Sequence, residues 1–330
     1  MMITPVVWQQ ALAEALSDPV ELFTLLELPK ELLPAAFKAD ADFRLKVPRS
    51  FIQKMTKGDI KDPLLVQILP SGIEMEQRLG FVDDPLLENH VNPIPGLLHK
   101  YQSRALLIVT GACGINCRYC FRRHFPYHDN KPSQTEWIHA LDYLQQHPEI
   151  NEVILSGGDP LLAPDHVLAA LVAKISMIPH IQTLRIHTRL PVFIPSRITP
   201  ALITWFTTSR LKPVLVTHIN HPREIDASFV GSMQRLQKNG VTLLNQSVLL
   251  RGVNDQVDVL RELSITLFQQ AGILPYYLHL LDRVNGGAHF EVPVVEATLL
   301  MQRLRAALAG YLVPRLAQEV AGAASKFVLG

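Results

Sequence analysis

Cysteine is scarce in this chain, and its few cysteines stand together. The 330-residue sequence has three, Cys113, Cys117 and Cys120. Three thiols this close in sequence cannot build a disulfide framework, and crowded free thiols suit a reducing compartment. The sequence therefore argues against a disulfide-stapled secreted scaffold and predicts a cytoplasmic location.

An excess of charge of either sign is also lacking. The chain has 31 basic and 30 acidic side chains and a net charge of +1. Nothing in this balance would attract nucleic acid or an anionic membrane. We therefore expect small-molecule ligands, with no nucleic-acid partner and no membrane partner.

Long apolar runs are missing as well. No stretch reaches the roughly 18 to 20 uninterrupted apolar residues of a membrane-spanning helix. The N-terminus, MMITPVVWQQALAEAL, does not have the basic, apolar and small-residue parts of a signal peptide. With 48% hydrophobic and 18% charged residues, the chain is expected to be soluble with a large buried core.

Two patterns divide the chain. The first part has short helical stretches broken by proline, such as ELFTLLELPKELLP. After Tyr101, short aliphatic runs alternate with amphipathic stretches, which is typical of a parallel sheet with crossover helices. The six expected strands span residues 105–110, 152–156, 183–188, 213–219, 241–250 and 274–280. The expected helices include residues 135–147, 165–177, 224–239, 255–270 and 293–309.

Six successive βα units favour an α/β fold, a partial (β/α)6 barrel open on one side, with its site at the carboxyl ends of the strands. A doubly wound open sheet is the alternative. We expect a mainly helical N-terminal extension over residues 1–100, the barrel core over 101–310 and a short C-terminal extension over 311–330.

The cysteines form a C-x3-C-x2-C motif directly after the first expected strand. Three thiolates on a short loop can ligate three irons of an iron–sulfur cluster and leave the fourth iron open. An open iron can chelate the amino and carboxylate groups of S-adenosylmethionine. A zinc site would need His124 or His128 as a fourth ligand, and three unrelated thiols are a further alternative. We favour the cluster.

Further segments extend the motif: CGINCRYCFRRHF, ILSGGDPLL, LRIHTRLPVFIPSRIT, LLNQSVLLRGVND and PYYLHLLDRVNGGAHF. From about Pro95 to the C-terminus the chain resembles the lysine 2,3-aminomutase family of the radical S-adenosylmethionine (SAM) superfamily. The resemblance implies the radical SAM type of partial barrel, a [4Fe-4S] cluster, SAM and pyridoxal 5′-phosphate. It also implies an isomerase that converts free L-α-lysine to β-lysine, in the R form, with an external reductant such as flavodoxin or ferredoxin. A functional link to the lysyl-ligase that modifies translation elongation factor P is implied too.

The resemblance also assigns residues to the cofactors. The cluster ligands would be the three cysteines, and the phosphate of the coenzyme would lie near Lys100 and Arg104. Lys326, after the small-residue stretch AGAAS, would be the catalytic lysine that carries pyridoxal phosphate, although the family has more glycines there. The SAM-contacting positions would be Ser156, Gly157, Gly158, Asp159, His187 and Gln246. An ordinary βα turn capped by Asp159, buried polar groups satisfied within the core, and solvated surface cations are the alternatives.

A lysine substrate needs a guanidinium for its carboxylate and acids for its ε-ammonium. Arg122, two residues after Cys120, matches the family's substrate-carboxylate arginine and is also expected to be catalytic. Asp282 and Glu319 are the candidates for the ammonium. The family has aspartate where this chain has Glu319, and an ion pair with Arg283 is the alternative role for Asp282.

Two other functions remain open from the sequence. A radical mutase of another amino acid, such as glutamate, would keep every motif except the acidic pair. A non-catalytic iron–sulfur electron carrier or binding protein would keep the cysteines but would not need Lys326 or Arg122.

Overall fold

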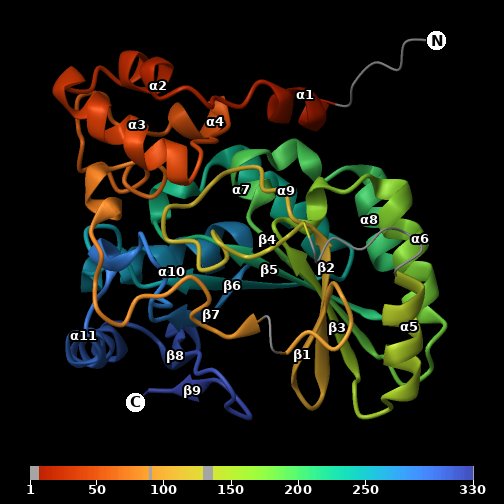
Figure 1. Cartoon of the computed structure of the whole chain (residues 1–330). Helices are drawn as coiled ribbons and strands as arrows, with labels where there is room; N and C mark the ends of the chain where they lie inside the picture. The colour runs from red at the N-terminus through yellow and green to blue at the C-terminus, as the bar shows by residue number, and fades with distance from the viewer. Residues whose placement is uncertain (1–6, 89–90, 129–136, 330) are drawn as a thin grey trace, which may run out of the picture.

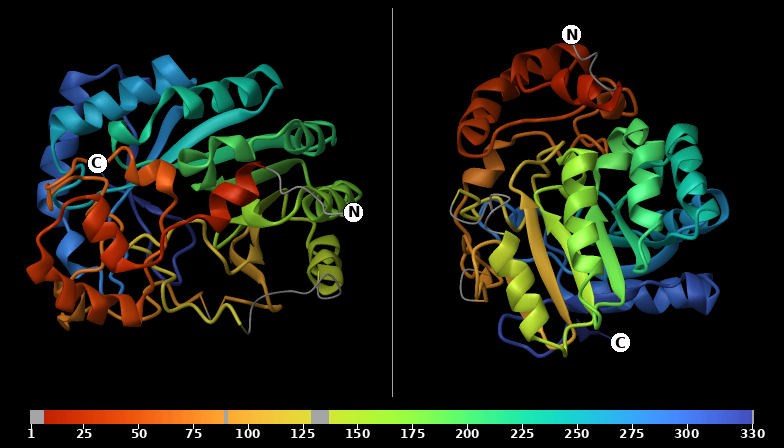
Figure 2. Two further views of the ribbon diagram at one scale, coloured as in Figure 1. Left: turned by 90° about the horizontal axis from the view of Figure 1, so that it is seen from above. Right: turned by 90° about the vertical axis from the view of Figure 1, so that its right-hand side faces the viewer.

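One curved sheet organises the chain. The computed structural model describes residues 7–88, 91–128 and 137–329. In these ranges the sheet has nine strands, which lie side by side in chain order from β1 to β9. Helices cover its outer face, and an N-terminal helical layer crosses one end (Figures 1 and 2).

The six expected strands are all present and pair in parallel with their neighbours. They are β2 (Arg104–Thr110), β3 (Glu152–Gly157), β4 (Thr183–Thr188), β5 (Lys212–His218), β6 (Thr242–Val248) and β7 (Leu274–His279). A doubly wound sheet reverses its strand order at a switch point, whereas this order follows the chain throughout. The α/β partial barrel is therefore confirmed, and the doubly wound alternative is wrong.

Three further strands lie outside the six expected ones. β1 (Leu97–Tyr101) forms an antiparallel hairpin with β2, β8 (Arg315–Gln318) extends the parallel array beyond β7, and β9 (Phe327–Val328) returns antiparallel to β8. β8 and β9 are too short to show a periodic apolar pattern, so only their neighbours in the sheet define them.

The crossover helices for which a range was expected agree with it to within a few residues, and α8, over Pro200–Thr207, had no expected range. The main ones are α5 (Trp137–Gln146), α6 (Asp165–Ser176), α8 (Pro200–Thr207), α9 (Ala227–Lys238), α10 (Val257–Ala271) and α11 (Val294–Ala307), with a short α7 (Leu190–Phe193) before α8. Residues 135 and 136 of the first expected helix lie outside the described residues. α9 begins later than residue 224 because a 3-10 turn, Pro222–Glu224, precedes it and Asp226 caps it by accepting from the Phe229 amide.

The N-terminal helices form a layer that packs directly against the barrel. Its α-helices are α1 (Val7–Ala13), α2 (Pro19–Leu25), α3 (Leu33–Asp42) and α4 (Arg49–Ile52), with 3-10 turns at Lys30–Leu32 and Gly72–Met75. Buried Phe51 and Leu65 of this layer and its connection belong to the same hydrophobic cluster as Leu155 of β3 and Ile186 of β4.

The layer also holds the cysteine loop. Lys46 Nζ donates to the Cys113 carbonyl at 2.8 Å, and the Asn116 amide donates to the Lys46 carbonyl at 3.0 Å. The Arg118 amide donates to the Gln67 carbonyl at 2.8 Å. The part of the loop after β2 from Cys113 to Arg118 is therefore fixed by contacts from outside the barrel.

The expected boundaries at residues 100 and 310 separate strands that belong to one sheet. β1 spans residue 100, and β8 and β9 belong to the expected C-terminal segment. The division at residues 100 and 310 stays a prediction. Across the described ranges, no helix is both long and apolar enough to cross a membrane.

Candidate functional site

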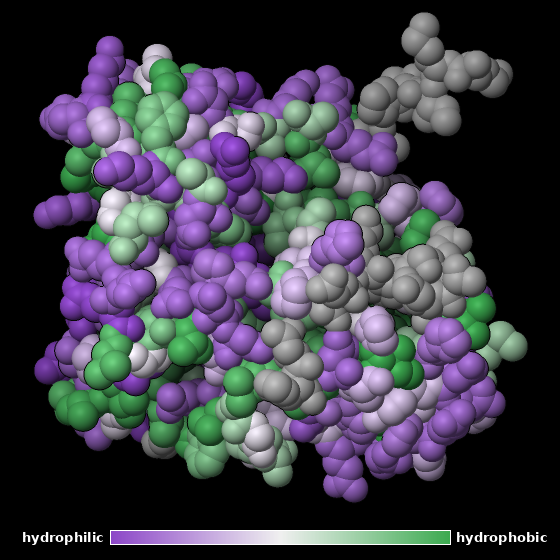
Figure 3. All heavy atoms as spheres, viewed as in Figure 1, coloured by the Kyte–Doolittle hydropathy of each residue, from purple (hydrophilic) through white to green (hydrophobic). Residues whose placement is uncertain are grey.

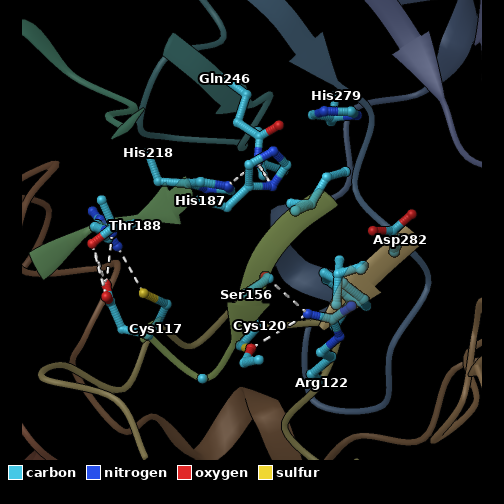
Figure 4. A pocket seen from close by; sticks show the side chains of 18 of the residues that line it. Cys117, Cys120, Arg122, Ser156, His187, Thr188, His218, Gln246, His279 and Asp282 are labelled. Carbon is cyan, nitrogen blue, oxygen red and sulfur yellow. Dashed lines mark hydrogen bonds between the residues drawn. The ribbon is translucent and has the colours of Figure 1, made fainter. Parts of the chain in front are cut away.

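A cavity of about 270 Å³ opens at the carboxyl ends of the parallel strands and continues into the barrel interior. Each of the seven parallel strands, or the loop after it, contributes to its wall. The expected site residues all line it: Lys100, Arg104, Cys113, Cys117, Cys120, Arg122, Ser156, Gly157, Gly158, Asp159, His187, Gln246, Asp282, Glu319 and Lys326. Figure 4 shows several of them facing the same space from different strands. Their individual roles stay predictions.

The three cysteines form one end of the cavity, on the loop after β2. Burial and the neighbouring Cys117 raise the pKa of Cys120 to about 11, and burial together with Cys120 raises that of Cys113 well above its ordinary value. Three thiolates crowded in this way repel one another unless a positive metal centre joins them. Across residues 7–88, 91–128 and 137–329, no three histidine, cysteine or carboxylate side chains are already grouped as a metal-ion site, so the fit to a cluster rests on this donor chemistry.

The zinc alternative has no support from the position of His124. This side chain lines a separate small cavity, where its Nε2 lies 3.7 Å from Asp83. It therefore does not face the cysteines.

The glycines after β3 are required by the cysteine loop, not by a ligand alone. Gly157 has φ +118, and a Cβ there would lie 2.5 Å from the Thr110 carbonyl oxygen. A Cβ at Gly158 would lie 2.2 Å from the carbonyl oxygen of Ala112. The end of β2 and the loop after it therefore rest directly on the backbone of these two residues, which leaves no room for a side chain at either position.

Asp159 ties two strand ends together. Its carboxylate accepts hydrogen bonds from the hydroxyl of Thr188 and from the backbone amides of Leu161, Arg189 and Leu190. The capping role that we weighed as an alternative is therefore present, because Leu161 lies in the 3-10 turn Pro160–Leu162 that Asp159 caps. With its oxygens used in this way, Asp159 positions the loop after β4.

A group of imidazoles and one amide faces the cysteines across the cavity. The Gln246 amide contacts both His187 and His218, and His187 Nε2 is buried without a hydrogen-bond partner in the described structure. Burial lowers the pKa of His218 and of His279 to about 3, so both are neutral at pH 7. Neutral rings and an open imidazole nitrogen fit an adenosyl ligand, as expected for His187 and Gln246.

Sequence analysis missed His218 and His279. Each lies at the carboxyl end of a parallel strand, β5 and β7, as His187 lies near the end of β4. If the polar residue at the carboxyl end of every expected strand had been considered, both histidines would have been found.

The other end of the cavity holds lysines between carboxylates. Lys326 Nζ is in hydrogen-bond contact with Glu319, whose other oxygen lies 3.4 Å from Lys100 Nζ and 3.1 Å from the Tyr101 hydroxyl. Burial alone would raise the pKa of Glu319, but Lys326 and Lys100 outweigh it and lower this pKa to about 2. The Arg104 guanidinium lies 4.4 Å from the centre of the Tyr101 ring. One amine beside two further cations fits an aldehyde coenzyme that carries a phosphate.

Strand pairing explains why Glu319 and Lys326 meet. In the antiparallel pair β8 and β9, Gln318 is opposite Phe327, so the residues one step further along face each other. The two residues are seven positions apart in sequence, but the hairpin brings them together.

Arg122 is held by a carboxylate that the sequence did not suggest. Its Nε and Nη2 donate to the two oxygens of Glu88 at 2.5 and 2.9 Å, and Lys100 Nζ lies 2.9 Å from the same carboxylate. Glu88 is only 3% exposed. It belongs to no motif, so only the folded chain brings it to Arg122. Arg122 Nη1 remains near Ser156 Oγ and the Gly157 carbonyl, at 3.5 and 3.3 Å.

Asp282 faces the cavity instead of pairing with its neighbour. Arg283 binds Glu291 at 2.7 Å, so the ion pair that we considered for Asp282 is not formed. Burial and the nearby charge of Glu319 raise the pKa of Asp282 to about 7. Two acids therefore stand close together beside the lysine end of the cavity.

Comparison with known proteins agrees with this arrangement. The family model described as the Radical SAM superfamily matches residues 107–263. The chain is 51% identical over 319 residues to the L-lysine 2,3-aminomutase of Haemophilus influenzae, which covers 97% of this chain and 94% of the relative. It is 52% identical over 320 residues to the enzyme of that name from Escherichia coli, covering 97% and 93%. The enzyme of that name from Clostridium subterminale is 35% identical, covering 97% of this chain and 76% of the relative.

Among solved structures, a radical SAM methyltransferase from Sphaerobacter thermophilus matches with a TM-score of 0.48 and 14% identity over 67% of this chain and 68% of that chain, a likeness too distant to carry an argument. The relatives above, in contrast, are about half identical along nearly the full length of both chains. The chain belongs to the lysine 2,3-aminomutase family of the radical SAM superfamily.

Proposed function

We propose that this chain converts L-α-lysine to β-lysine as a lysine 2,3-aminomutase. One observation carries the proposal: a single cavity joins three thiols at one end to a lysine, an arginine and two acids at the other. An enzyme of this type needs the radical source and the amine carrier within reach of one substrate. An electron carrier would need only the first of these ends.

The cluster with SAM supplies the hydrogen-abstracting radical, and pyridoxal phosphate supplies the carrier for the migrating nitrogen. The chain's own residues bind and orient. Cys113, Cys117 and Cys120 would hold the cluster, Lys326 would hold the coenzyme, and Lys100 and Arg104 would balance its phosphate charge.

The substrate would lie between the two ends. Arg122 would bind its carboxylate through the Nη1 edge that Glu88 leaves open. Asp282 and Glu319 would bind the ε-ammonium, since a cation is stabilised by buried acids. This pair of acids favours lysine over glutamate, whose side chain carries the opposite charge.

We further propose the R product, a supply of β-lysine to the ligase that modifies elongation factor P, an external donor such as flavodoxin or ferredoxin, and a cytoplasmic location. The proposed division of the chain is a helical extension over residues 1–100, a barrel core over 101–310 and a segment carrying Lys326 over 311–330. The contacts of Lys46 and Gln67 with the cysteine loop support a bracing role for the extension.

Anaerobic reconstitution followed by separate assays of lysine and glutamate tests this function. We expect β-lysine only when iron, sulfide, SAM, pyridoxal phosphate and a reductant are all present. Cys113→Ala, Cys117→Ala and Cys120→Ala should each abolish SAM cleavage, since each removes one of three ligands. Turnover of glutamate but not lysine would replace the substrate assignment, and a cluster without any coenzyme absorbance would favour the electron carrier.

A further inference from the structure

Arg189 is a buried cation that the reaction outlined above does not use. It follows Thr188 at the end of β4 and is 7% exposed. Its Nη1 donates to Cys117 Sγ at 2.7 Å. A guanidinium is therefore in direct contact with one of the three thiols, Cys117, which Figure 4 shows near Thr188 at the edge of the cavity.

Two acceptors hold the other side of the guanidinium. Arg189 Nη2 donates to Gln67 Oε1 at 2.7 Å and to Glu224 Oε2 at 2.9 Å. Gln67 and Glu224 are both fully buried. Gln67 comes from the segment that joins the N-terminal layer to the barrel, and Glu224 from the loop after β5. The guanidinium is thus fixed from two directions besides its own loop.

The backbone and the rings around Arg189 add to this fixation. Its amide donates to Asp159 at 2.8 Å, which links it to the glycine turn after β3. Its guanidinium carbon lies 5.1 Å from the ring centre of Phe193 and 5.6 Å from that of Tyr119. These contacts leave the side chain little freedom to turn away from the thiol.

The charge of Arg189 persists despite its burial. A guanidinium keeps its proton in proteins, and the carboxylate of Glu224 lies 2.9 Å from Nη2. A full positive charge in a low-dielectric region acts strongly on a neighbouring sulfur. Hydrogen bonds and charge near the sulfurs are among the features that set the potential of an iron–sulfur cluster.

We propose that Arg189 is a positioning residue that orients Cys117 and raises the reduction potential of the cluster through its charged hydrogen bond to the Cys117 sulfur. The proposal rests on the proposed function only in assuming that the three cysteines hold a [4Fe-4S] cluster. One electron from an external one-electron donor enters the cluster, no bond is formed or broken, and Arg189 stabilises the negative charge that is added.

The test is an anaerobic reductive titration of the reconstituted chain without SAM, followed by electron paramagnetic resonance. Arg189→Gln removes the charge, so we expect the midpoint potential to fall by about 59 mV or more, which is a tenfold loss in the one-electron equilibrium constant. Arg189→Lys keeps the charge and should recover part of the shift. Arg197→Gln is the matched control, because Arg197 is equally buried but donates to Leu161, Ala163 and Asp165 away from the cavity.

A second variant, Glu224→Gln, independently tests the direction in which the midpoint potential shifts. It removes a negative charge next to Arg189 without changing size, so the potential should rise rather than fall. A purely structural role would not reverse the sign between the two variants. Glu224→Gln also keeps the proposal testable if Arg189→Gln does not fold.

Unchanged potentials in Arg189→Gln and Glu224→Gln, or equal shifts in Arg197→Gln, would overturn the proposal. A wild-type chain with a normal cluster but no lysine turnover would reject the proposed function and leave the role of Arg189 to be decided by the potentials. A wild-type chain that assembles no cluster would overturn both.

Discussion

At the scale of single residues, Lys326, Arg122 and Lys100 each already have an anionic partner in the cavity. Lys326 contacts Glu319, Arg122 binds Glu88, and Lys100 lies between Glu88 and Glu319. A buried charge without a partner is costly, and this chain of alternating charges removes that cost before any ligand arrives. A bound substrate or coenzyme therefore exchanges partners instead of finding bare charges.

Glu88 and Glu319 each serve two cations in this chain of charges, and Glu88 is the more buried of the two. Glu88→Gln should lower the free energy of unfolding by about 3 to 5 kcal/mol, because it leaves Arg122 and Lys100 next to each other without their carboxylate. Urea unfolding of the chain without cofactors measures this loss. The control is Glu76→Gln, which breaks an exposed pair with Arg78 and should cost about 0 to 1 kcal/mol. Equal losses in the two variants would show that Glu88 has no special role.

The raised pKa of Asp282 leads us to predict that lysine binding depends on pH. Its pKa is raised to about 7, so the carboxyl is mostly neutral at pH 6 and ionised at pH 8. The ε-ammonium prefers the ionised form, and lysine affinity should rise about tenfold over this interval. Asp282→Asn should abolish the rise. Calorimetry on the loaded chain without reductant measures both.

Norleucine, which has no ε-amine, is the control for the lysine titration. Its binding should not change in the same way between pH 6 and pH 8. An equal rise for norleucine, or a rise that survives in Asp282→Asn, would show that another group titrates.

At the scale of elements, the C-terminal hairpin decides where Lys326 lies. The turn between β8 and β9 includes Gly322 at φ +76, a backbone conformation that strains every residue with a Cβ. A Cβ at Gly322 would meet nothing within 4 Å, so the cost of a substitution comes from the backbone alone.

Gly322→Ala should weaken the hairpin by about 1 to 2 kcal/mol. Binding of pyridoxal phosphate should then weaken about fivefold or more if it needs the closed hairpin. A titration followed by coenzyme absorbance measures the affinity, and borohydride reduction with peptide mapping shows whether Lys326 is still labelled. Gly310→Ala is the control, because it has equal open space and ordinary backbone angles. Identical coenzyme affinities in the two variants would contradict the role of the turn.

At the scale of the whole molecule, the N-terminal layer and the barrel share one core. Figure 3 shows hydrophilic residues over much of the outer side of this layer, while Leu65 and Leu155 both belong to the buried cluster that joins the two parts. The same layer holds the cysteine loop through Lys46 and Gln67. Folding of the layer and order in the cluster-binding loop should therefore be coupled.

We expect one cooperative unfolding transition for the layer and the barrel. Leu65→Ala and Leu155→Ala should each lower the free energy of unfolding by about 2 to 5 kcal/mol and move the whole transition. Far-ultraviolet circular dichroism and tryptophan fluorescence, recorded on the same denaturant series, follow the unfolding transition. Leu299→Ala, at an exposed position of α11, should have little effect. Two separate transitions, with only one moved by each buried variant, would show that the layer folds independently.

Local patterns in the sequence were enough to predict the barrel strands and the loop that carries the three cysteines. Most strands from β2 to β7 contain aliphatic residues in a pattern that indicates burial, and the cysteine spacing carries its chemistry within eight positions. It followed that the polar residues at the strand ends lie close together, because the carboxyl ends of parallel strands share one edge of a sheet.

Only the tertiary structure decided the partners of these residues. The contacts of Arg122 with Glu88, of Arg189 with Cys117 and of Asp159 with the loop after β4 join positions about 30 to 70 residues apart, at places where no periodic pattern connects the two sequences. The strands β8 and β9 are too short to be recognised without the sheet that they extend. A sequence pattern records which face of an element is buried, but a charge pair depends on two distant elements reaching the same point, and only the packed chain determines that.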